Sequence, residues 1–175
     1  MKSADYLHTA FLLAKRANFR DIRPNPFVGA IVVDKNRVII GEGYHKKAGE
    51  AHAEVLAINN ALEKTTDLSN TTLYVTLEPC SMCAGVLVHS RIARLVFGAS
   101  DYKTGAAGSV LDLVRYPQFN HQLEVTSGVL AEECAAMLSA FFQRRRAEKK
   151  QLKQQGIQPD AESKLKNTDG GDVLF

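Results

Sequence analysis

The sequence has few cysteines, few prolines and no long apolar run, and each shortage excludes a class of protein. Its 175 residues include only 3 Cys, 5 Pro and 12 Gly, which excludes a disulfide framework, a collagen-like repeat and a low-complexity chain. The longest apolar stretch, 27–33, is far shorter than the roughly 18 residues that cross a membrane. The first residues also lack the apolar region of a signal peptide. We therefore expect a cytoplasmic protein without membrane contact, made of one domain and a short appendage.

Net charge is absent from most of the chain and is concentrated near its end. Residues 1–142 carry 14 Lys+Arg and 14 Asp+Glu, whereas residues 143–175 carry 8 and 5. The excess comes from one basic run: Arg144, Arg145, Arg146, Lys149, Lys150 and Lys153. Such a run is typical of a surface that binds nucleic-acid phosphates, and we predict that its three arginines do so. Cations at the C-terminal end of a helix are also favoured by the helix dipole, which is a purely structural alternative.

Apolar spacing predicts helices that alternate with strands. Helical spacing of apolar residues occurs in three segments: 3–17, 52–64 and 130–141. A further helix is expected to begin at Pro79, because proline is favoured at the first helical position. Five short apolar runs are typical of strands, the first two joined as a hairpin: 27–33, 38–44, 72–77, 95–97 and 123–126. This order predicts a layered α/β sandwich around a mixed five-stranded sheet that is parallel after the hairpin. Beyond Lys150 apolar residues become rare, so we predict a domain over 1–150 and a disordered polar tail over 151–175.

Three residues have the spacing and chemistry of a zinc site. His52 precedes Cys80 and Cys83, and one imidazole with two thiolates leaves the fourth position of a tetrahedral Zn²⁺ open, as in catalytic sites. Cys80 and Cys83 share one helix face in its first turn, where the dipole favours ionised thiols. A Cys-x-x-Cys pair alone could be a redox pair or half of a structural zinc site. A structural site needs a fourth ligand, and the other cysteine, Cys134, falls on the apolar stripe of the last helix.

Glu54 is the candidate general acid and base beside this metal. Residues two apart diverge by about 200° in a regular helix, so we expect His52 at the very start of its helix, where both side chains approach one site. Glu54 would take a proton from a zinc-activated water, pass it to the substrate ring and later protonate the leaving amine. The combination of His-x-Glu with Pro-Cys-x-x-Cys resembles the signature of zinc nucleobase deaminases. That resemblance implies hydrolytic deamination and a three-layer α/β/α sandwich of the cytidine deaminase type.

Residues 72–146 closely resemble bacterial tRNA adenosine deaminases, which make inosine at the anticodon wobble position. The similarity is carried by the segments TLYVTLEPC (72–80), MCAG (82–85), KTGAAGS (103–109) and ECAA (133–136). It implies a homodimer with a tRNA groove formed by Asp101, the loop at 103–109 and the last helix. On this resemblance Lys103 is a candidate RNA contact and Phe142 a candidate substrate contact.

The first third of the chain resembles a different enzyme, the pyrimidine deaminase of riboflavin biosynthesis. The resemblance rests on PNPFVGA (24–30) and GEGYHKKAG (41–49), whose Asn25 and His45 correspond to substrate contacts in that family. Phe27 and Ala53 are further candidate substrate contacts. Pro-Asn-Pro is also good turn chemistry, and a histidine after a strand can cap a loop. The chain is therefore a mosaic, which a divergent natural enzyme or an engineered hybrid would both explain.

The predicted function is hydrolytic deamination of adenosine to inosine in tRNA. The matched C-terminal half, the basic run and the aromatic pair at 141–142 favour an RNA loop whose splayed base enters a pocket. One alternative is deamination of a small aminopyrimidine nucleotide or another free base or nucleoside. A non-enzymatic alternative is a zinc-stabilised RNA-binding module, which would not need Glu54.

Overall fold

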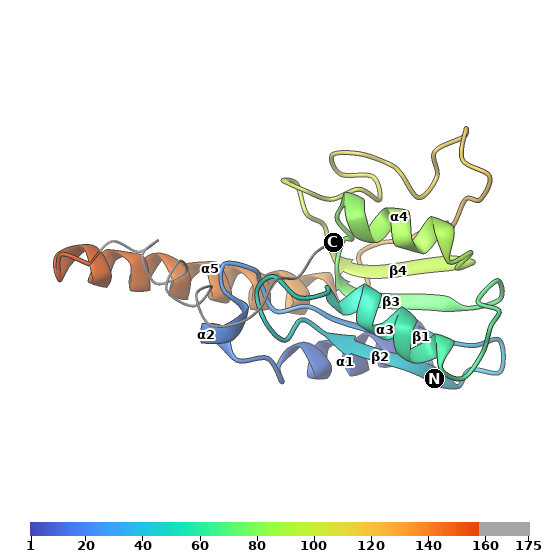
Figure 1. Ribbon diagram of the computed structural model, residues 1–175, viewed down its shortest axis with the longest axis horizontal. Coiled ribbons are helices and arrows are strands. Elements are labelled where there is room, and N and C mark those ends of the chain that lie inside the picture. Colours follow the sequence, from blue (N-terminus) through green and yellow to red (C-terminus); the bar gives the residue numbers. More distant parts are fainter. Residues whose placement is uncertain (158–175) are drawn as a thin grey trace, which may run out of the picture.

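Five strands form one mixed sheet at the centre of the molecule (Figure 1). The computed structural model describes residues 1–157. The strands are β1 (Gly29–Val33), β2 (Ile39–Tyr44), β3 (Thr72–Leu77), β4 (Arg94–Ala99) and β5 (Glu124–Thr126), in the order β2-β1-β3-β4-β5. β1 is antiparallel to both β2 and β3, whereas β3, β4 and β5 are parallel. The predicted mixed sheet, parallel beyond the first hairpin, is confirmed.

Helices cover both faces of this sheet. They are α1 (Ser3–Ala14), α2 (Phe19–Ile22), α3 (Ala53–Leu62), α4 (Ser81–His89) and α5 (Ala131–Gln154). α3 and α4 pack on the face that includes Val32, and α1 and α5 pack on the opposite face, with Ile31. Neighbouring residues of β1 point to opposite faces because side chains alternate along a strand. The predicted three-layer α/β/α sandwich is confirmed, and no helix in the described part of the chain could cross a membrane.

Several elements differ from the sequence-based expectation: α1 ends at Ala14 rather than at residue 17, and β4 is longer than the expected 95–97. α2 was not predicted, and its single turn packs Phe19 and Ile22 against Phe141 of α5. α4 begins at Ser81 rather than at Pro79, because the extended backbone of Cys80 is the N-cap.

α5 continues to Gln154, four residues into the segment predicted as a disordered tail. The Lys, Gln and Leu residues there are good helix formers, and the helix ends where Gly156 adopts a φ of 73°. The rest of the predicted tail, from residue 158, lies outside the described residues.

Glycines bring the helices close to the sheet beside the site. A Cβ on Gly43 of β2 would lie 2.4 Å from the Ala53 carbonyl oxygen of α3, and one on Gly29 would lie 2.0 Å from the Ala10 carbonyl oxygen of α1. Both distances are far below van der Waals contact, so only glycine allows this packing. The start of α3 is therefore held directly against the end of β2.

Candidate active site

Four chain segments meet at one edge of the sheet because of the strand directions. The parallel strands β3 and β4 both end there and are followed by the segments 78–80 and 101–104, while antiparallel β2 also ends there and β1 begins there. Together with the start of α3, they enclose a cavity of about 140 Å³ lined by Asn25, Pro26, Val28, His45, His52, Ala53, Glu54, Leu77, Glu78, Cys80, Asp101 and Thr104. This volume is below the roughly 300 Å³ of a pocket for a drug-sized molecule. Only the reacting base of a larger substrate would therefore enter it.

His52, Cys80 and Cys83 have the geometry of a zinc site. The Nδ1 atom of His52 lies 3.7 Å from the Sγ of Cys80 and 3.5 Å from that of Cys83. Zn–N and Zn–S bonds of about 2.0 and 2.3 Å at a tetrahedral angle separate nitrogen and sulfur by about 3.6 Å. The three ligand atoms lie within 4.8 Å of one another. The donor set therefore fits zinc, and three protein ligands leave one position open.

One of the two thiols, Cys80, already favours negative charge at this position. Hydrogen bonds with the Cys83 thiol and the His52 ring lower the pKa of Cys80 to about 4. The same bond to Cys80, together with burial, raises the pKa of Cys83. Cys80 is the N-cap of α4 and His52 the N-cap of α3, so the positive ends of two helix dipoles point at the site. A bound dication supplies the further positive charge that ionises both thiols.

Glu54 is buried beside the metal ligands in the first turn of α3. Its side chain is 4% exposed, and burial raises the pKa of its carboxyl group. His52 precedes the helix with φ of −70° and ψ of 163°, so its direction does not follow helical periodicity. The expectation that His52 lies at the irregular start of its helix is confirmed. A carboxyl group with a raised pKa next to the ligands is suited to accept and return a proton.

Asn25 and His45 form a hydrogen-bonded pair in the wall of the cavity. The Asn25 side-chain amide lies 3.1 Å from His45 Nε2, and His45 Nδ1 lies 3.3 Å from the Ala51 carbonyl oxygen. A carbonyl can only accept, so Nδ1 carries the proton and Nε2 accepts from Asn25. Burial lowers the pKa of His45, which favours this neutral form. Asn25 Oδ1 has no hydrogen-bond partner among residues 1–157 and can face a substrate.

The structure brings some predicted contact residues to the cavity and separates others from it. Ala53 and Asp101 line the cavity. Partial burial opposes the charged form of Asp101, but hydrogen bonds from Thr104 and from the backbone of Lys103 and Thr104 prevail and lower its pKa. Phe27 does not line the cavity and stacks edge-on against Phe141.

The remaining predicted contacts lie away from the cavity on the outside of the molecule. Phe142 is 38% exposed and contacts Phe141, and Lys103 is exposed beside Asp101. Arg144 lies over the ring of Phe19, and Arg145 is partly buried next to Glu148. Arg146 is exposed. None of these five side chains lines the cavity that receives the reacting base.

Sequence reasoning missed Glu78 as a polar residue of the cavity, and it included Thr104 only as part of the loop 103–109. Glu78 is 3% exposed, and its position directly before the Pro-Cys segment was a usable signal, since a chain that turns into a metal site needs supporting polar contacts. Thr104 hydrogen-bonds the Asp101 carboxylate through Oγ1 at 2.7 Å. This contact depends on a loop whose shape has no periodic pattern.

Comparison with known families agrees with this geometry. Residues 1–99 match the model of the cytidine and deoxycytidylate deaminase zinc-binding region. The tRNA-specific adenosine deaminase of Haemophilus influenzae is 58% identical over 129 residues, which cover 70% of this chain and 75% of that protein. The tRNA-specific adenosine deaminase of Bacillus subtilis is 46% identical over 151 residues, which cover 83% of this chain and 91% of that protein.

Solved structures reproduce both resemblances found in the sequence. One, from a study of A-to-I editing by tRNA:A34 deaminases, has a TM-score of 0.65 at 34% identity and covers 77% of this chain and 99% of its own. The diaminohydroxyphosphoribosylaminopyrimidine deaminase/reductase of Thermotoga maritima has a TM-score of 0.68 at 36% identity. The match covers 80% of this chain and 40% of that protein. The cofactor is zinc. The chain belongs to the zinc-binding cytidine and deoxycytidylate deaminase family and, within it, to the tRNA-specific adenosine deaminases.

Proposed function

We propose that this enzyme deaminates adenosine to inosine at the wobble position of a tRNA anticodon. The observation that carries the proposal is the small cavity with Glu54 and the three metal ligands at one end, in a chain 58% identical to a tRNA-specific adenosine deaminase. A cavity of about 140 Å³ admits a flipped base and leaves the rest of the RNA on the surface. We also propose that the enzyme acts in the cytoplasm without membrane contact, which a tRNA substrate supports.

The reaction adds water to C6 of adenine and releases ammonia. Zinc, held by His52, Cys80 and Cys83, is a Lewis acid that lowers the pKa of water toward about 7. Glu54 accepts a proton from the attacking water and donates it to a ring nitrogen; it then takes the second proton from the hydroxyl now on C6 and passes it to the amine, which leaves as ammonia. Asn25 holds the base edge through its available carbonyl oxygen, and the buried surroundings exclude bulk water.

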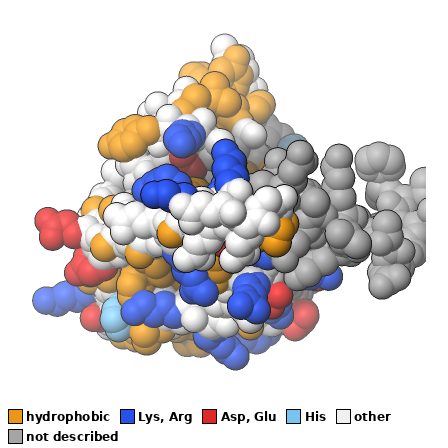
Figure 2. Space-filling view, turned by 90° about the vertical axis from the view of Figure 1, so that its left-hand side faces the viewer, with side chains coloured by type: hydrophobic (Ala, Val, Ile, Leu, Met, Phe, Trp, Pro, Cys, Tyr) orange, Lys and Arg blue, Asp and Glu red, His pale blue; other side chains and the backbone are white. Residues whose placement is uncertain are grey.

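Phosphate contacts are assigned to the exposed part of the basic run and to Lys103. Figure 2 looks along α5 from its C-terminal end and shows Lys and Arg side chains gathered on that face. Arg146 is exposed there, as are Lys149 and Lys150. Arg144 stacks on Phe19, and Arg145 lies next to Glu148, so these two arginines contribute to packing as well as to the local potential. Phe142, at 38% exposure, offers a ring on which an RNA base can stack.

We also propose a homodimer, supported by large apolar side chains on the outside of the segment 99–122. Tyr102 is 83% exposed, and Val110 and Leu111 are each 52% exposed. Exposed apolar side chains of this size are typical of protein interfaces.

Analytical ultracentrifugation tests the homodimer. The sedimenting species should have twice the mass of the chain, and Leu111→Glu should shift the protein toward the monomer. A wild-type protein that sediments as a monomer at micromolar concentration would contradict the proposal.

A second candidate substrate is a small aminopyrimidine nucleotide, favoured by one observation. The hydrogen-bonded Asn25 and His45 lie in the cavity wall, in the part of the chain that resembles the pyrimidine deaminase. Zinc chemistry does not distinguish adenine C6 from pyrimidine C4, so the residues at the base edge and the carrier must decide.

The deciding experiment compares substrates directly. The enzyme is incubated at equal concentrations of an anticodon stem-loop with adenosine at the wobble position, single-stranded DNA, and the aminopyrimidine nucleotide, and products are detected by mass spectrometry. We expect inosine in the stem-loop, and an increased rate in His45→Asn if the imidazole misplaces a base hydrogen bond. Turnover of the aminopyrimidine alone, abolished by His45→Asn, would overturn the tRNA assignment and support the second candidate. RNA binding without any turnover would leave only a zinc-stabilised RNA-binding module.

A further inference from the structure

Glu78 is a buried carboxylate in the cavity wall that the reaction above does not use. It follows the last residue of β3, is 3% exposed, and precedes the metal ligand Cys80 by two residues. A buried carboxylate is costly unless its oxygens are hydrogen-bonded. The structure therefore has to supply donors for both of them.

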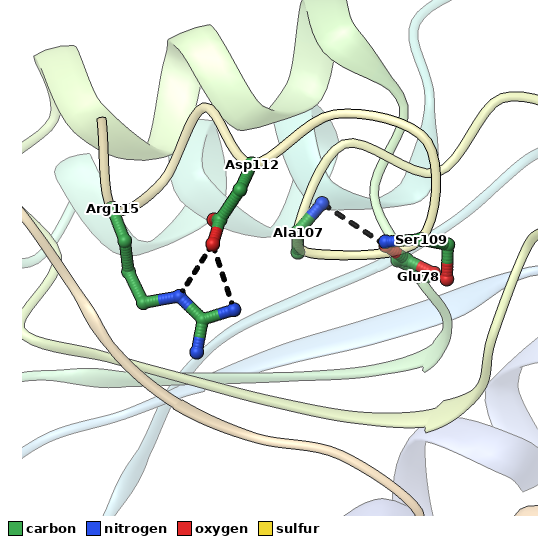
Figure 3. A network of polar contacts seen from close by, with 5 residues as sticks. All are labelled: Glu78, Ala107, Ser109, Asp112 and Arg115. Carbon is green, nitrogen blue, oxygen red and sulfur yellow. Dashed lines mark hydrogen bonds and ion pairs between the residues drawn. The ribbon is translucent and has the colours of Figure 1, made fainter.

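Four donors, all from the loop 101–109, reach the two oxygens of Glu78. Oε1 accepts from the backbone N–H groups of Ala107 and Ser109, both at 3.0 Å (Figure 3). Oε2 accepts from the backbone N–H of Asp101 at 2.9 Å and from the Ser109 hydroxyl. An ionised carboxylate offers about four acceptor sites, so the donors match its capacity. Among ionisable side chains only a carboxylate offers this many acceptor sites without a donor.

The loop is also fitted around the carboxylate at Gly105. A Cβ at this position would lie 2.5 Å from Glu78 Oε2 and 2.4 Å from the Asp101 carbonyl oxygen. The backbone of the same loop pairs with the metal-binding segment, since Ala106 donates to the Pro79 carbonyl at 2.8 Å and Gly105 forms a bridge with Cys80. The wall that contains Asp101 and Thr104 is thus held to the segment that carries the metal ligand.

We propose that Glu78 is a positioning residue that fixes the loop 101–109 as the substrate-facing wall at a set distance from the metal ligands. The inference rests on the proposed function for the identity of the substrate. The hydrogen bonds that both Glu78 oxygens accept within residues 1–157 all come from the loop 101–109, which leaves neither oxygen directed at the substrate. It acts through Asp101 and the backbone of the loop, which meet the substrate.

The first test is Glu78→Gln, with Glu124→Gln as the matched control. In the variant one oxygen can still accept from Ala107 and Ser109, and the new amide can donate to the Ser109 hydroxyl. The Asp101 N–H then faces a donor, so the loop is released at the residue that lines the cavity. Glu124 is an exposed carboxylate that pairs with Arg94 at the sheet edge, so the same substitution there leaves the loop unchanged.

Amide hydrogen exchange and steady-state kinetics measure the release of the loop 101–109 independently of each other. In the zinc-loaded enzyme we expect about tenfold faster exchange in peptides covering 101–109, with peptides of β3 and α4 unchanged. We expect KM for the anticodon stem-loop to rise about tenfold or more, with kcat within about threefold and one zinc per chain retained.

Gly105→Ala provides a second route to the same displacement, with Gly85→Ala as its control. The added Cβ pushes the loop away while the carboxylate remains, whereas a Cβ on Gly85 meets no atom within 4 Å. We expect Gly105→Ala to raise KM in the same way and Gly85→Ala to leave KM unchanged. This variant keeps the inference testable if Glu78→Gln does not fold.

Specific results would overturn the inference. Unchanged exchange in the loop, or a fall in kcat with an unchanged KM, would refute a positioning role. Uniformly faster exchange over the whole chain with loss of zinc would assign Glu78 to general stability instead. If the wild-type chain makes no inosine, the proposed function fails, while the exchange measurement still decides whether Glu78 holds the loop.

Discussion

Replacing Gly43 with alanine tests whether close packing of α3 on β2 sets the position of the active site. The added Cβ would lie 2.4 Å from the Ala53 carbonyl oxygen, whereas ordinary contact begins at 3.4 Å. The first turn of α3 must therefore move away by about 1 Å, the difference between these distances. His52 and Glu54 flank Ala53 in the sequence and move with it.

The expected size of the effect follows from this shift. Overpacking of this kind costs about 1 to 3 kcal/mol of unfolding free energy, which lowers the melting temperature by about 2 to 12 °C in a protein of this length. A misplacement of about 1 Å in catalytic groups reduces the rate by about a hundredfold. Weaker support of His52 reduces zinc affinity by about ten- to a hundredfold.

The assay measures the melting temperature, zinc content after dialysis and kcat on an anticodon stem-loop. Gly85→Ala is the control, because its Cβ has open space on α4 and should leave all three quantities unchanged. Wild-type kcat together with a wild-type melting temperature in Gly43→Ala would refute the reasoning. It would show that α3 does not depend on glycine at this contact.

Three further predictions concern the chemistry and the RNA surface. Glu54→Gln should retain one zinc per chain by metal analysis and lose about 10² to 10⁴ in kcat, and full activity would exclude Glu54 as the proton carrier. Cys83→Ser, or dialysis of the wild type against a chelator, should remove zinc and turnover together, and activity that persists without metal would contradict the zinc assignment. Arg146→Gln should reduce the salt dependence of RNA binding by about one unit at an unchanged melting temperature, whereas Arg144→Gln should also lower that temperature because its guanidinium stacks on Phe19. An unchanged salt dependence of RNA binding in both variants would show that these arginines do not contact phosphates and have only a structural role at the helix end.

Periodic segments were predictable because their pattern reports burial directly. The continuous β-branched apolar run in 27–33 predicted β1, all of whose residues are buried, and the incompatibility of His52 and Glu54 with one regular helix face correctly predicted that His52 lies before the helix. α2 was not predicted, because a single helical turn is too short to show a periodic pattern. Its burial depends on Phe141, which is more than 100 residues away in the chain.

Aromatic and loop residues were less predictable because their role depends on distant neighbours. Phe27 has the size and chemistry of a base-stacking residue, but Phe141 is positioned to pack against it, so the ring lies outside the cavity. The function of Glu78 depends on donors from a loop that begins 23 residues later. The contact of Phe27 leaves no signal in local spacing, and the position of Glu78 before the Pro-Cys segment indicates a supporting role without showing which loop it holds.

The strand order has a consequence for how such a chain can evolve. β3 lies between β1 and β4, so Asn25 and His45 reach the cavity from one side and Asp101 and Thr104 from the other. The segments that carry these four residues, 25–45 and 101–104, contain no metal ligand, because the ligands lie at 52, 80 and 83. Substitutions in either segment can therefore change the wall that faces the base without replacing a residue of the metal centre. A wall that resembles one deaminase can in this way lie opposite a wall that resembles another, around one catalytic centre.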